Sequence, residues 1–415
     1  MKDPWHDFIK EGVKSYATPM YIFAWQPVEQ ALREFDHFNL AIPIRHWLSF
    51  KTHPVGALVR KWKDCGFGVE VVSEFEYLAA RYEGFQGRSI IVNGPAKHTW
   101  LQKYKDNNII VHFDSLNEIN KLKMIAHERR WHVGLRVHVK VENDPDEPQY
   151  GGQFGLMPNE IQSAIRELEL VGNMIESFHF HIKSNVESEV LYKQAIYELS
   201  EICRVTHLSP KYLDCGGGLP VTGEKPVGFK VGDPEFQLDN YFNILANAKE
   251  SIPSLQEIWL ENGRFLTARS GVLVVRIIDI KERDDSRYLI CDGGRTNNAL
   301  VSDWEEHDVT WYPPRRGKKR LTTICGPSCM AYDRLIRLQL PETLSVGDIM
   351  IWHNAGAYHV PWETRFSRGY CRVIWYDDNG KMNLERKEES FFSWWGQWES
   401  VSRDTNECGA KPWGG

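Results

Sequence analysis

Short runs of β-branched and aromatic residues alternate with segments of helical periodicity from residue 44 to residue 264. Parallel strands need a long crossover connection, and a helix is the usual one, so this alternation predicts a parallel sheet built from βα units. Eight runs can be counted, and they centre on Trp47, Val71, Ile91, Val111, Leu135, Phe178, Leu213 and Leu260. Eight strands with intervening helices predict a (β/α)8 barrel of the TIM type, which is an α/β fold.

The helices of this barrel are expected where apolar residues recur at spacings of three and four, at 55–65, 74–82, 115–127, 159–171 and 188–205. Beyond Arg264 the apolar runs follow one another without helical segments, which predicts an all-β domain. Its expected strands are GVLVVRIIDI, YLICD, RLTTICG, DIMIWH and CRVIWY. The run TPMYIF at 18–23 is too far ahead of the barrel to belong to it and is expected to join the β domain. We therefore predict a barrel domain at 26–265 and a β domain formed by 1–25 together with 266–415.

The composition argues against several classes of protein. The chain has 415 residues and a formal net charge of -6 with both signs spread along it, which disfavours nucleic acid as a partner. No apolar run approaches the roughly 18 residues of a membrane span, and the N-terminal MKDPWHDFIKEGVKSY has no apolar signal segment. We expect a cytoplasmic protein with no membrane partner. Its eight cysteines form no CxxC pair, so we expect free thiols.

Candidate functional residues follow four of the predicted barrel strands. In barrels of this type the site lies at the carboxyl ends of the strands, and these ends read LSFKTHP, HFHIKSN, DCGGGLP and LENGR. The glycines of DCGGGLP allow backbone N–H groups to approach an anion, although a turn is the commoner use of such a triplet. Arg264, in the next loop, adds a donor that suits a phosphate.

Two ionisable residues in these loops point to cofactor chemistry. Lys51, partly desolvated in a barrel mouth, is expected to have a lowered pKa and to form a Schiff base, although most lysines are simply at the surface. Glu261 suits the pyridine nitrogen of pyridoxal 5'-phosphate (PLP), although a lone Glu is usually solvated or paired. His179 and His181 lack a third ligand at a suitable spacing, so we expect no metal and place one His against a cofactor ring.

Taken in order, these segments resemble the fold-type III PLP-dependent decarboxylases that act on diaminopimelate, ornithine and arginine, with the diaminopimelate branch most similar. The resemblance covers nearly the whole chain. It rests on the segments TPMYIF, SFKTHP, GVEVVSEFE, GGQFGL, HFHIKSN, DCGGGLP, ENGR, CDGG, GPSCMAYD and AGAY.

The resemblance implies roles for individual residues. Lys51 would hold the cofactor as a Schiff base, His181 would stack on its ring, and Glu261 would bind the pyridine nitrogen. The phosphate would be held by Ser184, Gly217, Gly218, Arg264 and Tyr358. Cys329 would donate a proton after CO2 is lost, and it would come from the second subunit of a homodimer with shared active sites.

The sequence departs from the family pattern at several of these segments. Lys183 stands where the family has Gly, so it either adds a charge near the phosphate or turns outward, and Asn262 replaces a Pro. Around the substrate, Met330 replaces an acidic residue that binds a distal amine, and Asn297 stands about where an Arg holds a carboxylate. Asp333 is a third tentative substrate residue.

These departures predict a small-molecule substrate other than free diaminopimelate. We expect meso-diaminopimelate to be a poor substrate and a larger amino-acid conjugate, of a siderophore or antibiotic pathway, to be the natural one, covered by tryptophans such as Trp304 and Trp362. The alternatives are a true diaminopimelate decarboxylase that makes lysine, a racemase or aldolase on a similar barrel, and an inactive partner-binding paralogue.

Overall fold

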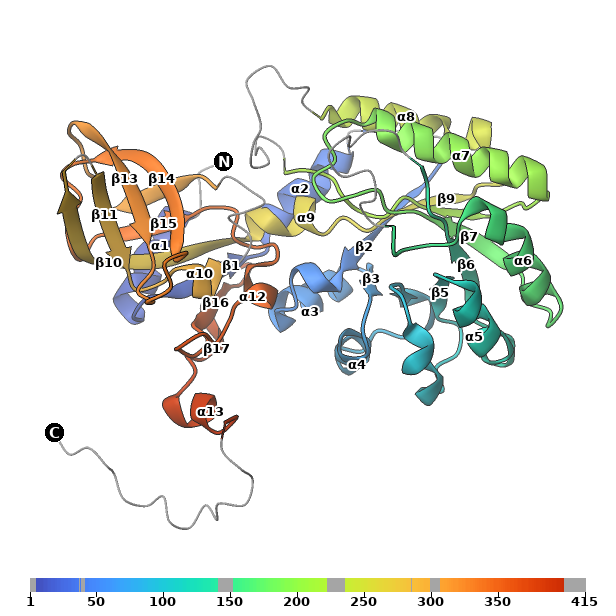
Figure 1. Cartoon of the computed structure of the whole chain (residues 1–415), viewed down its shortest axis with the longest axis horizontal. Coiled ribbons are helices and arrows are strands. Elements are labelled where there is room, and N and C mark those ends of the chain that lie inside the picture. The colour runs from blue at the N-terminus through green and yellow to red at the C-terminus, as the bar shows by residue number, and fades with distance from the viewer. Residues whose placement is uncertain are drawn as a thin grey trace, which may run out of the picture.

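The computed structural model describes residues 5–36, 38, 42–140, 152–221, 236–284, 286–298 and 307–398. Its larger part is a closed barrel of parallel strands with helices outside, which lies on the right of Figure 1. The barrel strands are β2 (Ile44–Ser49), β3 (Gly68–Val71), β4 (Ile90–Val92), β5 (Ile110–Phe113), β6 (His132–Arg136), β7 (Ile175–His179), β8 (Tyr212–Asp214) and β9 (Glu257–Leu260). These are the eight predicted strands, so the predicted fold class is confirmed. None of the helices within the described ranges is both long and apolar enough to span a membrane.

Five helices outside the barrel lie within about two residues of the positions that the apolar periodicity predicts: α3 (Gly56–Asp64), α4 (Glu74–Tyr82), α5 (Leu116–Glu128), α6 (Pro158–Glu169) and α7 (Val190–Thr206). Three more helices of this part were not predicted: α2 (Gln26–Asp36), α8 (Leu238–Ser251) and α9 (Arg264–Thr267). Short 3-10 turns are η1 (Phe50–Thr52), η2 (Gly87–Ser89), η3 (Lys97–Thr99), η4 (Leu101–Lys103) and η5 (Ala268–Ser270). Two helices begin at a serine whose side chain accepts a backbone N–H of the first turn: Ser73 for α4 and Ser115 for α5.

The barrel interior is layered, because alternate residues of each strand point inward. The lower layer is an apolar cluster of Trp47, Ile91, Ile110 and Trp259 with Tyr212 packed against it. At Gly68, a Cβ would lie 2.2 Å from the Trp47 ring, so a side chain larger than that of glycine would collide with it. Two residues further along each strand, the buried side chains are all polar: Ser49, Glu70, Asn93, His112, Arg136, His179, Asp214 and Glu261. This polar layer lies at the carboxyl ends of the strands, where the site is expected.

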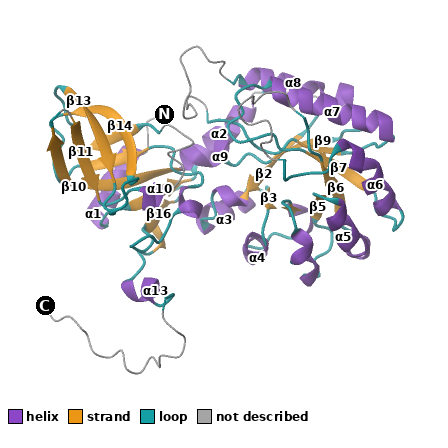
Figure 2. Cartoon of the chain, in the orientation of Figure 1, coloured by secondary structure: helices purple, strands orange, loops and turns teal. Residues whose placement is uncertain are grey.

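The second part is a nine-stranded sheet on the left of Figure 1, drawn in orange in Figure 2. Its strands are β1 (Met20–Ala24), β10 (Gly271–Arg283), β11 (Ser286–Cys291), β12 (Val309–Tyr312), β13 (Lys319–Cys325), β14 (Arg334–Pro341), β15 (Ile349–Trp352), β16 (Arg372–Tyr376) and β17 (Met382–Arg386). The predicted strand at 18–23 is β1, which pairs with β10 on one side and β16 on the other. The sequence analysis missed β12, β14 and β17. The exact domain boundaries stay a prediction.

Short helices accompany the sheet, which the sequence analysis expected to consist of strands alone. They are α1 (Trp5–Ser15), α10 (Arg295–Asn298), α12 (His359–Trp362) and α13 (Phe391–Trp395). All seven cysteines in the described ranges are free, and Cys408 lies outside these ranges.

The sheet part contacts the barrel next to Lys51. The backbone N–H of Tyr358 donates to the Thr52 carbonyl at 2.8 Å, and His53 Nδ1 is 2.6 Å from the Gly356 carbonyl. These bonds hold the segment that carries Tyr358 against the turn that carries Lys51. Tyr358 therefore reaches the barrel mouth although it follows β15 in the chain.

Candidate active site

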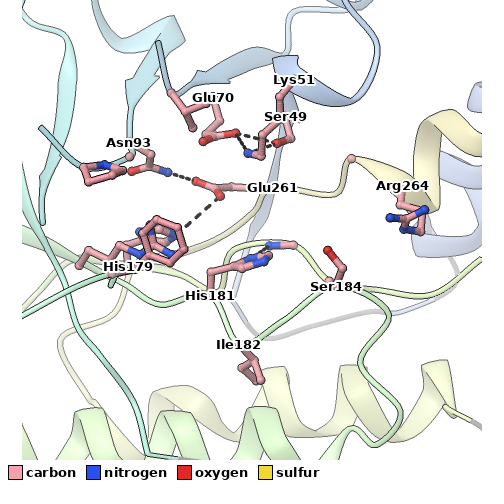
Figure 3. Close-up of a pocket in the computed structure, with 18 of the residues that line it drawn as sticks. Ser49, Lys51, Glu70, Asn93, His179, His181, Ile182, Ser184, Glu261 and Arg264 are labelled. Atoms are coloured by element: carbon pink, nitrogen blue, oxygen red, sulfur yellow. Dashed lines mark hydrogen bonds and ion pairs between the residues drawn. The ribbon is translucent and has the colours of Figure 1, made fainter. Parts of the chain in front are cut away.

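A cavity of about 680 Å³ opens at the carboxyl ends of the barrel strands, and Figure 3 shows the side chains that line it. Its lining residues are Ser49, Lys51, Glu70, Val72, Asn93, Gly94, Pro95, Arg136, Gln153, Phe154, His179, His181, Ile182, Ser184, Gly217, Gly218, Glu261, Gly263, Arg264 and Tyr358. All eight residues predicted to bind the cofactor are among them. The structure therefore brings the predicted cofactor residues together, while their individual roles stay predictions.

The Lys51 amine is held by two neighbours at the top of the cavity in Figure 3. Its Nζ lies 2.6 Å from Ser49 Oγ and 2.8 Å from Glu70 Oε2, and Ser49 Oγ also donates to Glu70 at 2.7 Å. Burial by itself lowers the pKa of Lys51, but Glu70, Tyr358 and Glu261 outweigh it and the pKa is raised. The expectation of a lowered pKa is therefore wrong, since it considered desolvation without the Glu70 carboxylate.

Glu261 follows β9 and lines the cavity. Asn93 Nδ2 donates a short hydrogen bond to Glu261 Oε1, and His179 Nε2 lies 3.6 Å from Glu261 Oε2. Asn93 Oδ1 is in turn 2.8 Å from His112 Nδ1. Burial, together with the Asp214 and Glu70 carboxylates, raises the pKa of Glu261 well above its usual range. The cofactor-free site therefore favours the protonated form of Glu261.

The glycine loop and its neighbours form the other end of the cavity. A Cβ at Gly217 would lie 2.5 Å from the Glu261 carbonyl oxygen, and one at Gly218 would lie 2.3 Å from the Lys183 carbonyl oxygen. Gly218 also has φ +99, in the left-handed region that favours glycine. The Arg264 guanidinium lies 4.7 Å from the centre of the Tyr358 ring. The glycine loop, the Arg264 guanidinium and the hydroxyl groups of Ser184 and Tyr358 all line this cavity, and a set of donors of this kind suits a phosphate.

His181 lies between these two ends. Its Nδ1 accepts the backbone N–H of Gly217 at 3.2 Å. Burial, with smaller effects of Arg136 and Lys51, lowers the pKa of His181 to about 3. The ring is therefore uncharged at neutral pH, which suits face-to-face packing against a flat cofactor.

Of the five site residues predicted from the β domain, Tyr358 lines this cavity, whereas Asn297, Cys329, Met330 and Asp333 do not. Cys329 is exposed and its neighbour Met330 is half-buried. Both Asp333 carboxylate oxygens accept backbone N–H groups, those of Arg295 and Ser328.

Asn297 is also used within the β domain. Its Nδ2 donates to Glu363 at 2.9 Å and its Oδ1 accepts from Gly294 at 3.3 Å. Trp362 is 44% exposed on α12, and Trp304 lies outside the described residues. A substrate role for these residues stays a prediction.

The two departures beside the cofactor site have clear positions. Lys183 Nζ pairs with Glu187 at 3.1 Å, so of the two expected orientations its ammonium takes the one away from the cavity. Asn262 is buried, and neither of its side-chain polar atoms has a hydrogen-bond partner among the described residues.

The sequence analysis missed several polar residues of the site. Glu70, Arg136 and Asp214 lie within barrel strands, Asn93 follows β4 directly, and Ser49 ends β2. A charged residue inside a parallel strand that is buried on both faces was the available signal. His112, Asp214 and Glu261 have potential ligand atoms within 4.8 Å of one another. His112 is linked to Glu261 through Asn93, and the expectation of no metal at this site stays a prediction.

Comparisons with known proteins agree with this geometry. A family model described as "Pyridoxal-dependent decarboxylase, pyridoxal binding domain" matches residues 28–268. The diaminopimelate decarboxylase of Deinococcus radiodurans is 24% identical over 92% of this chain and 96% of its own. The 2-[(L-alanin-3-ylcarbamoyl)methyl]-2-hydroxybutanedioate decarboxylase of Staphylococcus aureus is 26% identical over 70% of this chain and 77% of its own.

The structure has a similar neighbour among solved structures. The diaminopimelate decarboxylase of Helicobacter pylori, solved with L-lysine, has a TM-score of 0.80 and 20% identity, and the match covers 94% of this chain and 99% of that one. At this identity the likeness supports the fold alone.

The residues that line the cavity fit PLP. Its glycine loop has no room for a Cβ at Gly217 or Gly218, so only backbone atoms stand between this loop and a bound group. At the opposite end a carboxyl group, Glu261, lies within reach of a ring, and an amine, Lys51, lies between them. Lys51, Glu261 and His181 would hold the aldehyde carbon, the ring nitrogen and the ring face. When bound, PLP supplies an electron sink for the charge left on a substrate that loses CO2.

Proposed function

Because this chain belongs to the pyridoxal-dependent decarboxylases, it is a PLP-dependent carboxy-lyase, and we propose that it decarboxylates an α-amino acid joined to a larger group. The observation that carries this proposal is the contrast between the two parts of the site. The residues predicted to hold the cofactor all line one cavity. The segment GPSCMAYD, by contrast, has Met330 where the resemblance implies an acidic residue.

The residues of the cavity have the following proposed tasks. Lys51 forms the bond to the cofactor and releases the product amine, and Glu70, 2.8 Å from Nζ, holds the Lys51 ammonium in place until the amine reacts. Ser184, the glycine loop, Arg264 and Tyr358 hold the phosphate, so that the reacting end stays fixed.

The missing acidic side chain favours a conjugate over free diaminopimelate. Losing a hydrogen bond to a charged group costs about 1.5 to 3 kcal/mol, or roughly tenfold to a hundredfold in affinity. Met330 cannot provide that contact to a distal ammonium. The Staphylococcus aureus relative is named for a substrate in which alanine is linked through an amide to a hydroxylated dicarboxylate. A substrate of that chemical class has no distal ammonium that needs a partner.

Steady-state kinetics tests the substrate proposal. CO2 release should be measured on meso-diaminopimelate, ornithine, arginine and a panel of amide-linked 2,3-diaminopropionate conjugates. We expect the largest kcat/KM for a conjugate, and a value of about 10⁴ M⁻¹s⁻¹ or more on meso-diaminopimelate would contradict the proposal. Diaminopimelate decarboxylation is the second candidate, because relatives with that name match over nearly the whole chain.

Borohydride reduction tests the assignment of Lys51 and distinguishes an active enzyme from an inactive paralogue. Reduction of the PLP-loaded protein should add a pyridoxyl mass to the peptide that contains Lys51. The control is Lys51→Ala, which should take up no label. A label on another lysine would refute the assignment, and the absence of any label would favour the inactive paralogue. Membership of a decarboxylase family argues against the racemase and aldolase alternatives.

We also propose a cytoplasmic homodimer with shared sites. Cys329 is exposed and does not line the cavity of its own chain, so a role as proton donor needs a second copy. The exposed aromatic residues of and beside α13 are of the type enriched in subunit interfaces: Phe391, Phe392, Trp395 and Trp398.

A subunit-mixing experiment tests this arrangement. Homodimers of Lys51→Ala and of Cys329→Ala should each be nearly inactive. Random exchange of equal amounts gives half heterodimers, each with one intact site of two, so about a quarter of wild-type activity should return. Proven exchange without recovery would place Cys329 in its own subunit's site.

A further inference from the structure

A second carboxyl group lies behind Glu261, and no predicted role uses it. Asp214, the last residue of β8, has no exposed surface. Its Oδ1 accepts the backbone N–H of Gly216 at 2.9 Å, whereas its Oδ2 has no hydrogen-bond partner among the described residues. Potential ligand atoms of Asp214, Glu261 and His112 lie within 4.8 Å of one another. Asp214 Oδ2 is therefore a buried acceptor beside the Glu261 carboxyl group, which is expected to face the cofactor ring.

The hydrogen bonds around Glu261 decide where a proton on it must lie. Asn93 uses its carbonyl oxygen toward His112, at 2.8 Å, and its amide nitrogen toward Glu261 Oε1. An amide nitrogen can only donate, so Oε1 is an acceptor and a proton on Glu261 is on Oε2. Oε2 is the oxygen that lies 3.6 Å from His179 Nε2.

The charges around this pair do not neutralise two carboxylates. The ionisable groups that face it from the other barrel strands and loops are Lys51, Glu70, His112, Arg136, His179 and His181. Lys51 is paired with Glu70 at 2.8 Å, and Arg136 with Asp114 at 3.6 Å. The three histidines all have pKa values lowered by burial and are uncharged at neutral pH.

From this geometry we propose that Asp214 is a positioning residue for Glu261: the two carboxyl groups hold one proton between them in the cofactor-free protein, and Glu261 gives up that proton when a ring with a protonated nitrogen binds. This inference rests on the proposed place of the ring nitrogen beside Glu261. The O–H bond of Glu261 breaks, its electron pair stays on the carboxylate, and the proton leaves to solvent, because the ring nitrogen of the free ligand already carries a proton at neutral pH.

The acid–base balance of the pair agrees with one retained proton. Burial, and then the charges of Asp214 and Glu70, raise the pKa of Glu261, and Lys51 only partly offsets them. Burial also raises the pKa of Asp214 to about 7, although the neighbouring Glu261 and the Gly216 N–H lower it. Two carboxyl groups this close lose their protons in two separate steps, and the pKa of each step belongs to the pair and not to one residue. Removing the charge of Asp214 should let Glu261 ionise more readily and lose its stored proton.

Proton counting on binding tests the inference without any turnover. The ligand is 4'-deoxypyridoxine 5'-phosphate, which lacks the aldehyde and so cannot react with Lys51. Its binding enthalpy at neutral pH is measured in buffers of different ionisation enthalpy, and the slope gives the protons taken up. We expect wild type to release about one proton on binding and Asp214→Asn to release less, because Glu261 of the variant has already given up part of its proton before the analogue binds. The same slope in both proteins would overturn the inference.

Two further variants separate this inference from the proposed site. Asp292→Asn removes a partly buried carboxylate that accepts a backbone N–H of Arg276 at 2.8 Å in the β domain, and it should behave as wild type. Glu261→Gln should bind the analogue at least about tenfold more weakly, since it cannot form the carboxylate that pairs with the protonated ring nitrogen. If Glu261→Gln binds as tightly as wild type, the proposed site itself is wrong.

An infrared difference spectrum of the wild-type protein gives a second measurement if Asp214→Asn fails to fold. Binding of the analogue should remove one protonated-carboxyl band from the spectrum of the cofactor-free protein. A spectrum without that loss would overturn the inference.

Discussion

The substitution Glu70→Gln tests how the site controls the charge of Lys51. Glu70 Oε2 lies 2.8 Å from Lys51 Nζ. Among the groups that raise the pKa of Lys51 against the effect of burial, the Glu70 carboxylate has the largest effect. Gln keeps the size and an acceptor oxygen but removes the negative charge. A neighbouring opposite charge within about 4–6 Å typically changes a pKa by about 1 to 3. The Lys51 side chain is 39% exposed. Water therefore screens the ion pair, and the expected change in the pKa of Lys51 is about 1. The neutral fraction of the amine should therefore rise about tenfold at neutral pH.

The assay is the initial rate at which the cofactor-free protein forms a Schiff base with PLP, followed by absorbance across a range of pH. Only the neutral amine attacks the aldehyde, so Glu70→Gln should react about tenfold faster than wild type at neutral pH. The two rates should converge at high pH. Glu76→Gln is the control, because Glu76 accepts the Val72 N–H and makes no hydrogen bond to Lys51. An unchanged rate for Glu70→Gln, or a slower one at every pH, would refute the reasoning.

Three further predictions concern the frame of the site. Gly218→Ala should weaken PLP binding at least about tenfold in a fluorescence titration, because the new Cβ would lie 2.3 Å from the Lys183 carbonyl oxygen and φ is +99. Unchanged affinity would contradict a phosphate at this loop. Gly68→Ala, with a Cβ 2.2 Å from the Trp47 ring, should lower the free energy of unfolding by about 1 to 3 kcal/mol in urea. Burial lowers the pKa of His53 to about 4, whereas the unfolded chain takes up that proton at about pH 6.5. Stability is therefore lost as the pH falls between these values, and urea midpoints at several pH values should fall less steeply for His53→Gln than for wild type.

The sequence predicted the barrel well because its signal is local and repeated. Each strand is a short apolar run followed by a helical segment, and all eight runs became β2 to β9. The sheet was harder to predict. In β14 exposed and buried residues alternate along RLIRLQLP, and its arginines conceal the apolar face. Strand β1 was correctly placed only because its distance from the barrel excluded it from the barrel sheet.

The site was predictable where residues follow a strand and obscure where they lie within one. Lys51, His181 and Glu261 all come after a barrel strand, and the loop rule found them. Glu70 and Asp214 lie inside strands, so their contacts depend on the register between neighbours, which one sequence does not reveal. The pKa of Lys51 was predicted in the wrong direction for the same reason, since its partner Glu70 was not recognised.

The position of β1 has a consequence for how this chain is made. Tyr21 pairs with Leu273 in β10 and with Val373 in β16, so the second partner is more than 300 residues away. A ribosome must complete nearly the whole chain before the central strand of the sheet has both neighbours. Until then the backbone of β1 has an unpaired edge, which is the feature that recruits foreign strands. The chaperone demand of this protein should therefore depend on its N-terminal segment, and a C-terminal fragment that begins after the barrel would leave a gap between β10 and β16.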